Sequence, residues 1–308
     1  MSIVSRIDRI TGIPAENRGT FIAPPKSVKI ELTAACQYRC SFCVKSLRPD
    51  DGEMDRALYS RLIKEMAAAG VEEIGLFYIG ESFLCKWLPE AIKEAKDAGI
   101  EYVFLTTNGA SATPDKVEAC MEAGLDSLKF SMNFYDGEQF KSIAQVKPAL
   151  YRNAIANLKA AHEIRALGQY RTKLYASSIA FDGEQGEKMQ LIIDDIKPYL
   201  DEHYFLPLYG MSGAAKAHGF KPRPGNPGRL ENLREPLPCW SLFQGHITKD
   251  GFFAACCFGS GIDGDMLMAD LKKVSFLEGW NSLKFQDLRA AHLRRDVKGT
   301  PCETCAAG

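Results

Sequence analysis

Short apolar runs alternate along this chain with longer stretches in which apolar residues recur every three or four positions. The short runs predict buried strands, and the recurring pattern predicts amphipathic helices. The expected strands are 27–32, 73–78, 102–106, 127–132, 172–179 and 203–207, and the expected helices between them are 55–69, 87–98, 114–123, 151–167 and 186–199. Regular alternation of strand and helix with short links indicates right-handed crossovers between parallel strands.

Six strand–helix units are too few for a closed eight-stranded barrel, so residues 27–208 are expected to form an open, partial (β/α)6 barrel. Residues 1–26 have mixed character and end near two prolines, which predicts an irregular lead-in. Residues 209–236 are rich in Gly and Pro without a sustained period, which predicts a linker.

The last part of the chain, 237–308, is expected to form a small α+β domain. A hairpin is predicted over 247–255, because Lys249-Asp250-Gly251 is typical of a tight turn between strands. A final helix is expected over about 282–293. The predicted fold class is therefore α/β, with a partial barrel followed by this smaller domain.

Composition excludes several classes of protein. Of 308 residues, 46% are hydrophobic and 25% are charged, which are ordinary globular values. The formal net charge of −1 provides no field to hold nucleic acid or an anionic membrane. The N-terminus lacks a continuous apolar segment and no apolar run reaches about 18 residues, so we expect no signal peptide, no membrane span and a cytoplasmic location.

Ten cysteines, unevenly distributed, are the most informative feature of the sequence. Cys85 and Cys120 lie in or beside helical patterns and are expected in the core. The other eight form two groups almost 200 residues apart: 36, 40 and 43, then 239, 256, 257, 302 and 305. In a reducing compartment, clustered cysteines are more often metal ligands or catalysts than disulfides.

The first group has the spacing C-x3-C-x2-C and follows the first predicted strand. Structural zinc requires four protein ligands, whereas Cys36, Cys40 and Cys43 supply three. Three thiolates on a four-iron cluster would leave one iron open to a small molecule. A zinc site completed by a remote residue, or three unrelated thiols, are the alternatives.

With Phe42 before its last cysteine, this group resembles the C-x3-C-x-aromatic-C motif of the radical S-adenosylmethionine (SAM) enzymes. The resemblance implies a [4Fe-4S] cluster on Cys36, Cys40 and Cys43 whose open iron binds SAM. In that family, reductive cleavage of SAM yields a 5′-deoxyadenosyl radical that abstracts a hydrogen atom. A flavodoxin or ferredoxin type of electron donor is implied as well.

The same resemblance assigns cofactor-binding residues at the ends of later strands. Gly80 and Glu81 match the segment that holds the methionine amine, although Ile79 stands where the family has glycine. Asn108 lies in a turn common in the family, and Ser131 and Asn133 match the residues near the ribose. The alternatives are a solvated Glu and an ordinary Asn-Gly turn.

The second group resembles the SPASM and twitch extensions of these enzymes, which bind auxiliary clusters. The resemblance implies one auxiliary [4Fe-4S] cluster on four of the five cysteines, Cys239, Cys256, Cys302 and Cys305. Cys257 is then spare and could donate a hydrogen atom to a substrate radical. The alternatives are that Cys257 is a ligand in place of Cys256, that it is an inert thiol, or that zinc occupies the site.

The leading functional interpretation is oxidation of a small polar metabolite, such as a sugar or aminocyclitol, with the auxiliary cluster accepting an electron. We expect a small substrate because 26 residues before the first strand are too few for a leader-peptide-binding domain. The alternatives are a redox-neutral epimerase that uses Cys257, an enzyme that modifies a ribosomal peptide, and a non-catalytic iron–sulfur or zinc protein.

Overall fold

One nine-stranded sheet organises the protein in a computed structural model that describes residues 2–47, 51–181, 183–206, 237–256 and 264–303. Its strands are β1 (Ser27–Ile30), β2 (Glu73–Gly75), β3 (Tyr102–Thr107), β4 (Ser127–Ser131), β5 (Lys173–Ile179), β6 (Glu202–Leu206), β7 (Gly245–Ile247), β8 (Phe252–Ala254) and β9 (Leu267–Asp270). The spatial order is β6-β5-β4-β3-β2-β1-β7-β8-β9. Strands β1 to β6 are parallel, β7 pairs with β1 in parallel, and β8 and β9 continue antiparallel.

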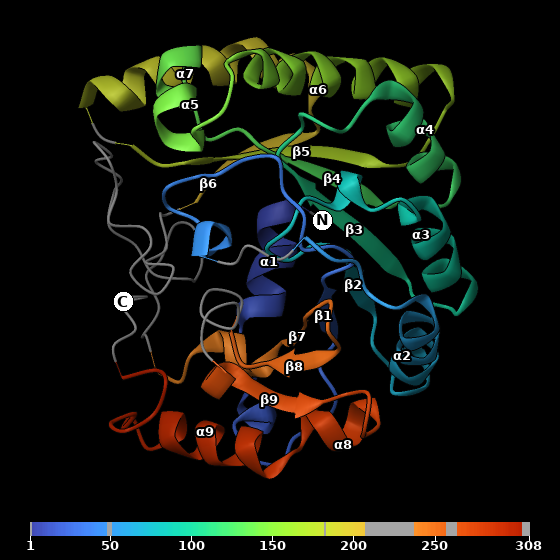
Figure 1. Cartoon of the computed structure of the whole chain (residues 1–308), viewed down its shortest axis with the longest axis vertical. Helices are drawn as coiled ribbons and strands as arrows, with labels where there is room; N and C mark the ends of the chain where they lie inside the picture. Colours follow the sequence, from blue (N-terminus) through green and yellow to red (C-terminus); the bar gives the residue numbers. More distant parts are fainter. Residues whose placement is uncertain (1, 48–50, 182, 207–236, 257–263, 304–308) are drawn as a thin grey trace.

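The sheet is curved, and helices cover its convex side (Figure 1). We call its concave face the hollow. The helices are α1 (Ile3–Thr11), α2 (Arg56–Ala68), α3 (Leu88–Asp97), α4 (Pro114–Glu122), α5 (Gly137–Ala144), α6 (Ala149–Leu167), α7 (Gly183–Ile196), α8 (Phe276–Trp280) and α9 (Leu283–Leu293). Figure 1 shows α2, α3, α4, α6 and α7 outside the curve and α1 inside it. The predicted α/β class with a parallel partial barrel is confirmed.

Alternation along the strands separates the core from the hollow. Val28 and Ile30 of β1 are fully buried and belong to the main hydrophobic cluster, together with Leu62 and Met66 of α2. Neighbouring positions of a strand face opposite sides, so Lys29 faces the hollow. The six expected strands and five expected helices of this region all form, with ends that differ by a few residues.

The expected irregular lead-in is wrong, because most of its first half is helix α1. The Ser2 side chain accepts a hydrogen bond from the Ser5 amide and caps the helix. Ile3 and Ile7 pack with Tyr175 and other residues at the open edge of the sheet. Arg6 and Arg9, which interrupt the apolar pattern of the sequence, both form ion pairs with Glu73 of the sheet.

Helix α1 closes the hollow at the end where the strands begin. Arg6 Nη1 lies 2.9 Å from Glu73 Oε2, and Arg9 Nη2 lies 3.0 Å from Glu73 Oε1. The Arg6 guanidinium also stacks 4.5 Å from the ring centroids of Tyr102 and Phe104. Glu73 and Tyr102 are the first residues of β2 and β3, so α1 caps the end of the sheet opposite the cysteine loop.

The C-terminal region contains the expected hairpin and final helix. Strands β7 and β8 are antiparallel, and Gly251 turns between them with a φ of 78° while its amide donates to the Thr248 carbonyl. Strand β9 and helices α5 and α8 were not anticipated. Phe253, Trp280 and Phe285 form the buried aromatic centre of this region. The predicted linker 209–236 lies outside the described residues.

The residues after α1 run along the C-terminal helices. The Trp280 indole N–H donates to the Ala23 carbonyl at 2.8 Å, and Asn281 Nδ2 donates to the Ile22 carbonyl at 2.9 Å. Arg289, fully buried, donates to the Thr20 carbonyl at 3.0 Å. These bonds tie the first residues of the chain to α8 and α9.

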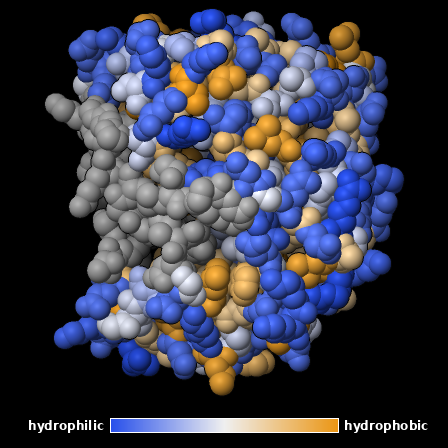
Figure 2. All heavy atoms as spheres, viewed as in Figure 1, coloured by the Kyte–Doolittle hydropathy of each residue, from blue (hydrophilic) through white to orange (hydrophobic). Residues whose placement is uncertain are grey.

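Hydrophilic side chains dominate the face shown in Figure 2, and hydrophobic ones occur there in separate small groups. None of the helices within the described ranges has the length and apolarity needed to cross a bilayer.

Candidate functional site

The first cysteine group lies in a loop after β1 that is clamped to the end of α5. The Arg39 amide donates to the Ala144 carbonyl, and the Ser41 amide donates to the Ile143 carbonyl, both at 2.9 Å. The Cys43 amide donates to the Cys40 carbonyl at 2.9 Å and closes a turn between the last two cysteines. Helix α5, which the sequence pattern did not reveal, therefore fixes the backbone of the cysteine loop.

Aromatic side chains surround this loop. Tyr38 and Phe42 are buried in a cluster with Phe134 and Phe140, and the rings of Tyr38 and Phe140 lie 5.0 Å apart in a T-shaped arrangement. Cys36, Cys40 and Cys43 pack against the same cluster while staying partly exposed. The three thiols therefore lie against an apolar surface. The assignment of Phe42 as a cofactor contact stays a prediction.

The three thiols form an electrostatically coupled set. Burial raises the pKa of Cys36 to about 12, and the Glu81 charge adds to the effect. Burial raises the pKa of Cys40 well above its usual value, with further contributions from Cys43 and Cys36. The pKa of Cys43 is also raised by burial. A bound cation lowers the pKa of a thiol that ligates it, so thiolates at these positions would be stabilised by a metal centre.

A single zinc ion would require the three thiols to converge. A zinc ion about 2.3 Å from each sulfur needs its ligands packed around one point. Among the described residues, no three or more His, Cys, Asp or Glu side chains converge closely enough to hold one ion. Burial and, after it, the charges of Cys43 and Cys36 raise the pKa of Cys40, and the choice between a cluster and a zinc ion stays a prediction.

Glu81, predicted to bind the SAM amine, connects β2 to β3 at the mouth of the barrel. Its Oε1 accepts from Thr107 Oγ1 at 2.7 Å and from the Phe83 amide at 3.2 Å, and its Oε2 accepts from the Asn108 amide at 2.7 Å. Burial raises the pKa of Glu81, and these donors oppose the rise. Three hydrogen bonds therefore fix the orientation of the Glu81 carboxylate. It retains acceptor capacity for one further donor.

Gly80 brings this segment against the cysteine loop. A Cβ at residue 80 would collide with the Thr33 carbonyl oxygen and come within 3.0 Å of the Ala35 carbonyl oxygen. The Glu81 amide donates to that Ala35 carbonyl at 2.7 Å. Only glycine permits this approach, so Gly80 sets the distance between Glu81 and the backbone that leads to Cys36.

Asn108 points toward the first cysteine. Its Nδ2 lies 3.8 Å from Cys36 Sγ and 3.3 Å from Gln37 Oε1, and its Oδ1 accepts from Gln37 Nε2 at 3.1 Å. Ser131 ends β4 and Asn133 follows two residues later, both partly exposed, with the buried Met132 between them facing the core. The structure thus brings Glu81, Asn108 and Cys36 together at one mouth.

The described part of the second cysteine group consists of Cys239, Cys256 and Cys302, all partly exposed. Ser241 Oγ donates to the Ala255 carbonyl at 3.3 Å, which holds the segment after Cys239 beside the segment before Cys256. The Cys302 amide donates to Thr300 Oγ1 at 3.2 Å in a C-terminal turn. Cys257 and Cys305 lie outside the described residues, so the choice between Cys256 and Cys257 as a ligand stays open.

Tyr78 connects the two groups. Its hydroxyl donates to the Cys256 carbonyl at 2.8 Å, and its ring lies 5.9 Å from the His246 ring of β7. Tyr78 follows β2 two residues before Gly80, so one short segment contacts both the first cysteine loop and the backbone of the second group. The sequence pattern assigns Tyr78 no role, because its partner Cys256 lies 178 residues away.

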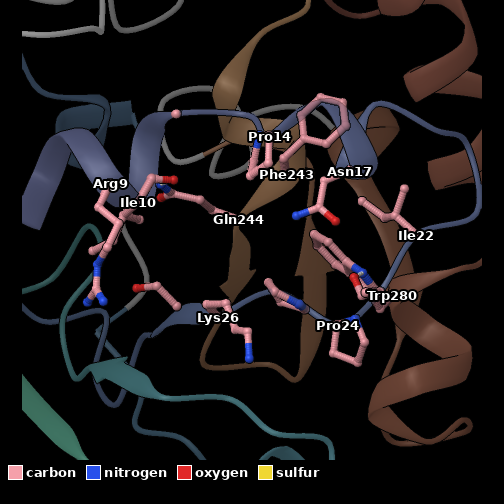
Figure 3. Close-up of a pocket in the computed structure, with 14 residues that line it drawn as sticks. Arg9, Ile10, Pro14, Asn17, Ile22, Pro24, Lys26, Phe243, Gln244 and Trp280 are labelled. Atoms are coloured by element: carbon pink, nitrogen blue, oxygen red, sulfur yellow. Dashed lines mark hydrogen bonds between the residues drawn. The ribbon is translucent and has the colours of Figure 1, made fainter.

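A pocket of about 80 Å³ lies elsewhere, between α1, the residues before β1, and the C-terminal region (Figure 3). Arg9, Lys26, Gln244 and Trp280 are among the residues that line it. Lys26 and Ser27 come at the start of β1, whereas the cysteine loop follows its end. The pocket is too small for SAM and lies at the opposite end of the sheet, so it is not the reaction site.

Comparisons with known proteins agree with this architecture. A family model described as the radical SAM superfamily matches residues 30–195, and one described as an iron–sulfur cluster-binding domain matches 239–306. A GTP 3′,8-cyclase of Chlorobaculum tepidum is 38% identical over 38% of this chain and 36% of its own length. A PqqA peptide cyclase of Xanthomonas campestris is 32% identical over 48% of this chain and 38% of its own.

The aligned part of the chain thus spans little more than a third of these curated relatives. Among solved structures, Streptococcus suis SuiB bound to the precursor peptide SuiA covers 94% of this chain and 71% of its own, with a TM-score of 0.68 and 15% identity. BtrN in complex with AdoMet and 2-DOIA covers 87% and 86%, with a TM-score of 0.55 and 18% identity. These two likenesses show the fold.

Proposed function

Because the chain belongs to the radical SAM superfamily, we propose that it removes a hydrogen atom from a small polar metabolite and oxidises the resulting radical. Membership of the two matched families implies SAM, a SAM-binding [4Fe-4S] cluster and an auxiliary cluster. We assign the first cluster to Cys36, Cys40 and Cys43 and the second to Cys239, Cys256, Cys302 and Cys305. Residues 27–208 would be the catalytic domain and residues 237–308 the auxiliary-cluster domain, joined by the linker 209–236 and preceded by the N-terminal segment 1–26.

When bound, the reduced cluster and SAM supply a radical that abstracts hydrogen, and the auxiliary cluster supplies an acceptor for the second electron. The chain's own residues would orient these groups. Glu81 is held by three donors so that its remaining acceptor position can receive the SAM amine. Asn108 contacts Cys36 and Gln37, and Ser131 and Asn133 would contact the ribose.

One observation carries the proposal: the hydrogen bond from Tyr78 to the Cys256 carbonyl. It joins the mouth of the barrel, where SAM would bind, to the second cysteine group. An auxiliary cluster there would lie beside the substrate and could take up its second electron. Two-electron oxidation therefore accounts for the proximity of the two groups.

The roles of the two cysteine groups are separable by Cys40→Ala and Cys302→Ala. Reconstituted wild-type protein should contain about eight irons per chain, and each variant about four. With dithionite as reductant, Cys40→Ala should form no 5′-deoxyadenosine, whereas Cys302→Ala should still form it without completing substrate oxidation. Unchanged 5′-deoxyadenosine formation by Cys40→Ala would contradict the assignment of the first cluster.

The position of the auxiliary cluster is testable with Tyr78→Phe, which keeps the ring beside His246 and removes the hydroxyl that makes the 2.8 Å hydrogen bond. We expect product formed per 5′-deoxyadenosine to fall while cleavage of SAM continues. Tyr170→Phe is the matched control, because it removes the hydroxyl of a partly buried tyrosine that interacts with Glu122 and Glu118. An equal ratio in both variants would remove the support that Tyr78 gives.

The mass of the product distinguishes oxidation from epimerisation. Oxidation removes two hydrogens, whereas an epimerase that uses Cys257 would incorporate one solvent deuterium in heavy water.

The second candidate function is modification of a ribosomal peptide, which the similarity to a PqqA peptide cyclase favours. A cytoplasmic location and a flavodoxin or ferredoxin type of donor complete the proposal, since reduced, clustered thiols suit such a compartment.

A further inference from the structure

Two lysines on the concave face of the sheet have no counter-ion among the described residues. Lys29 lies in the middle of β1 and Lys129 in the middle of β4. Neither Nζ has an ion pair or hydrogen bond with the part of the chain that the structure describes, and both side chains are partly exposed. Lysine in the middle of a buried strand is costly, because its desolvated charge normally requires a partner.

Strand register places both lysines on one face. Lys29 pairs with Gly75 of β2, and Gly75 pairs with Phe104 of β3. Thr106, two residues beyond Phe104 and therefore on the same face, pairs with Lys129. Phe104 is the ring on which Arg6 of α1 stacks, so this shared face is the one that lines the hollow.

A buried, uncharged histidine lies on the same face. His246 of β7 pairs with Lys29 in register, so it also faces the hollow. It is 0% exposed, and among the described residues its ring interacts with the Gln244 backbone. Burial lowers the pKa of His246 well below its usual value, and the Lys29 charge adds to the effect. Burial likewise lowers the pKa of Lys129 to about 7, with contributions from Lys29 and Arg6.

The neighbours of the two ammonium groups are aromatic rings. Lys29 Nζ lies 5.5 Å from the Trp240 ring centroid and 6.0 Å from that of Phe77, and Lys129 Nζ lies 5.9 Å from that of Tyr204. Such contacts orient an ammonium group but replace only part of its hydration. The nearby carboxylate Glu73 is already bound by Arg6 and Arg9, so it neutralises neither lysine.

We propose that Lys29 and Lys129 bind an oxyanion of the substrate, a carboxylate or a phosphate, on the concave face of the sheet. This inference rests on the proposed function and narrows its substrate to an anionic metabolite. Lys129 lies two residues before Ser131, or about 7 Å deeper along β4. The anion would therefore bind below the SAM contacts, with the rest of the substrate reaching up toward the mouth.

The test measures binding of inorganic phosphate and of malonate to the reconstituted full chain by calorimetry. Lys29→Met and Lys129→Met keep the side-chain length and remove the charge. We expect at least one anion to bind the wild type saturably and each variant to lose about tenfold or more in affinity. Lys64→Met, on the exposed side of α2, is the matched control and should bind as the wild type does. Lys129→Arg should restore part of the affinity.

Which anion binds identifies the source: phosphate alone indicates a phosphorylated metabolite, and malonate alone indicates a carboxylic acid. No saturable binding of either anion, or equal binding by the lysine variants and Lys64→Met, would overturn the proposal. An equal loss of SAM affinity in the lysine variants would overturn it too, because the lysines would then hold the carboxylate of SAM. Formation of 5′-deoxyadenosine by the wild type with dithionite, measured without any anion, separates these results from failure of the proposed function.

Discussion

Gly80 and Glu81 are adjacent residues with different tasks at the same mouth. Glu81 orders the ends of β2 and β3 through Thr107 and Asn108. Gly80 lets this arrangement press against the loop that leads to Cys36. No side chain fits at residue 80, so Gly80 determines how close the Glu81 carboxylate comes to the cysteine loop.

Gly80→Ala should therefore weaken both the fold and the first cluster site. The added methyl group collides with backbone at Thr33, which cannot rotate away, and overpacking of this kind costs about 1–3 kcal/mol. We expect a lower denaturation midpoint and reduced iron content after reconstitution. Gly264→Ala serves as the control, because a Cβ there meets nothing within 4 Å. Equal midpoints for the two variants would show that the loop can move to accommodate the methyl group.

The residues whose partners are local were the easier ones to predict. The resemblance placed Glu81 and Asn108 at neighbouring strand ends, and the structure brings both to Cys36. Lys29 and Lys129 were missed, although each stands out as a charge inside an apolar strand. A single strand does not reveal which face lines a hollow, because that depends on its pairing with strands elsewhere in the chain.

Among the elements, α1 departs most from expectation. Its arginines made the sequence resemble an irregular segment, since an isolated helix would expose them to water. In the structure, Arg6 is 11% exposed and Arg9 is 56% exposed, although both bind the same Glu73 carboxylate. The two arginines therefore form a natural comparison of buried and exposed ion pairs.

Arg6→Met should destabilise the protein by about 3 kcal/mol, because it leaves a buried carboxylate with only a peripheral partner. Arg9→Met should cost less than about 1 kcal/mol, as exposed pairs do. Urea denaturation of both variants measures the difference. Similar losses in the two would indicate that α1 is held mainly by Ile3 and Ile7.

The repeating elements were predicted well because each strand and helix buries its own apolar face, which leaves a period in the sequence. Helix α5 is a different case. It contributes Phe140 and Ile143 to the cluster under the cysteine loop, but its eight residues give too short a pattern to identify. Such elements are stabilised by tertiary contacts that no local period records.

For the whole molecule, three histidines on separate elements are held neutral. Burial lowers the pKa of His203 and of His292 to about 4 and that of His246 well below its usual value. Unfolded histidine titrates near 6.5. The folded form thus binds fewer protons than the unfolded form below that pH, so acid favours unfolding.

The free energy of unfolding should therefore be fully retained above about pH 6.5 and fall as the pH drops toward 4, by at most about 1.4 kcal/mol per pH unit for each histidine. Denaturation midpoints at pH 7.5, 6.5 and 5.5 measure the slope. His203→Gln, which preserves a polar neighbour for Ser178, should flatten it. A slope identical to that of the wild type would mean that His203 is protonated equally in both states.

The pairing of β1 with β7 has a consequence for synthesis of the chain. Gly245 follows its partner Val28 by 217 residues, so β1 emerges from the ribosome long before that side of it can be covered. Until then β1 is an unpaired edge strand, and unpaired edge strands can pair with other chains. A chain that stops before Gly245 should therefore aggregate even with all six barrel strands present. The C-terminal hairpin thus covers the edge of β1 in addition to carrying part of the second cysteine group.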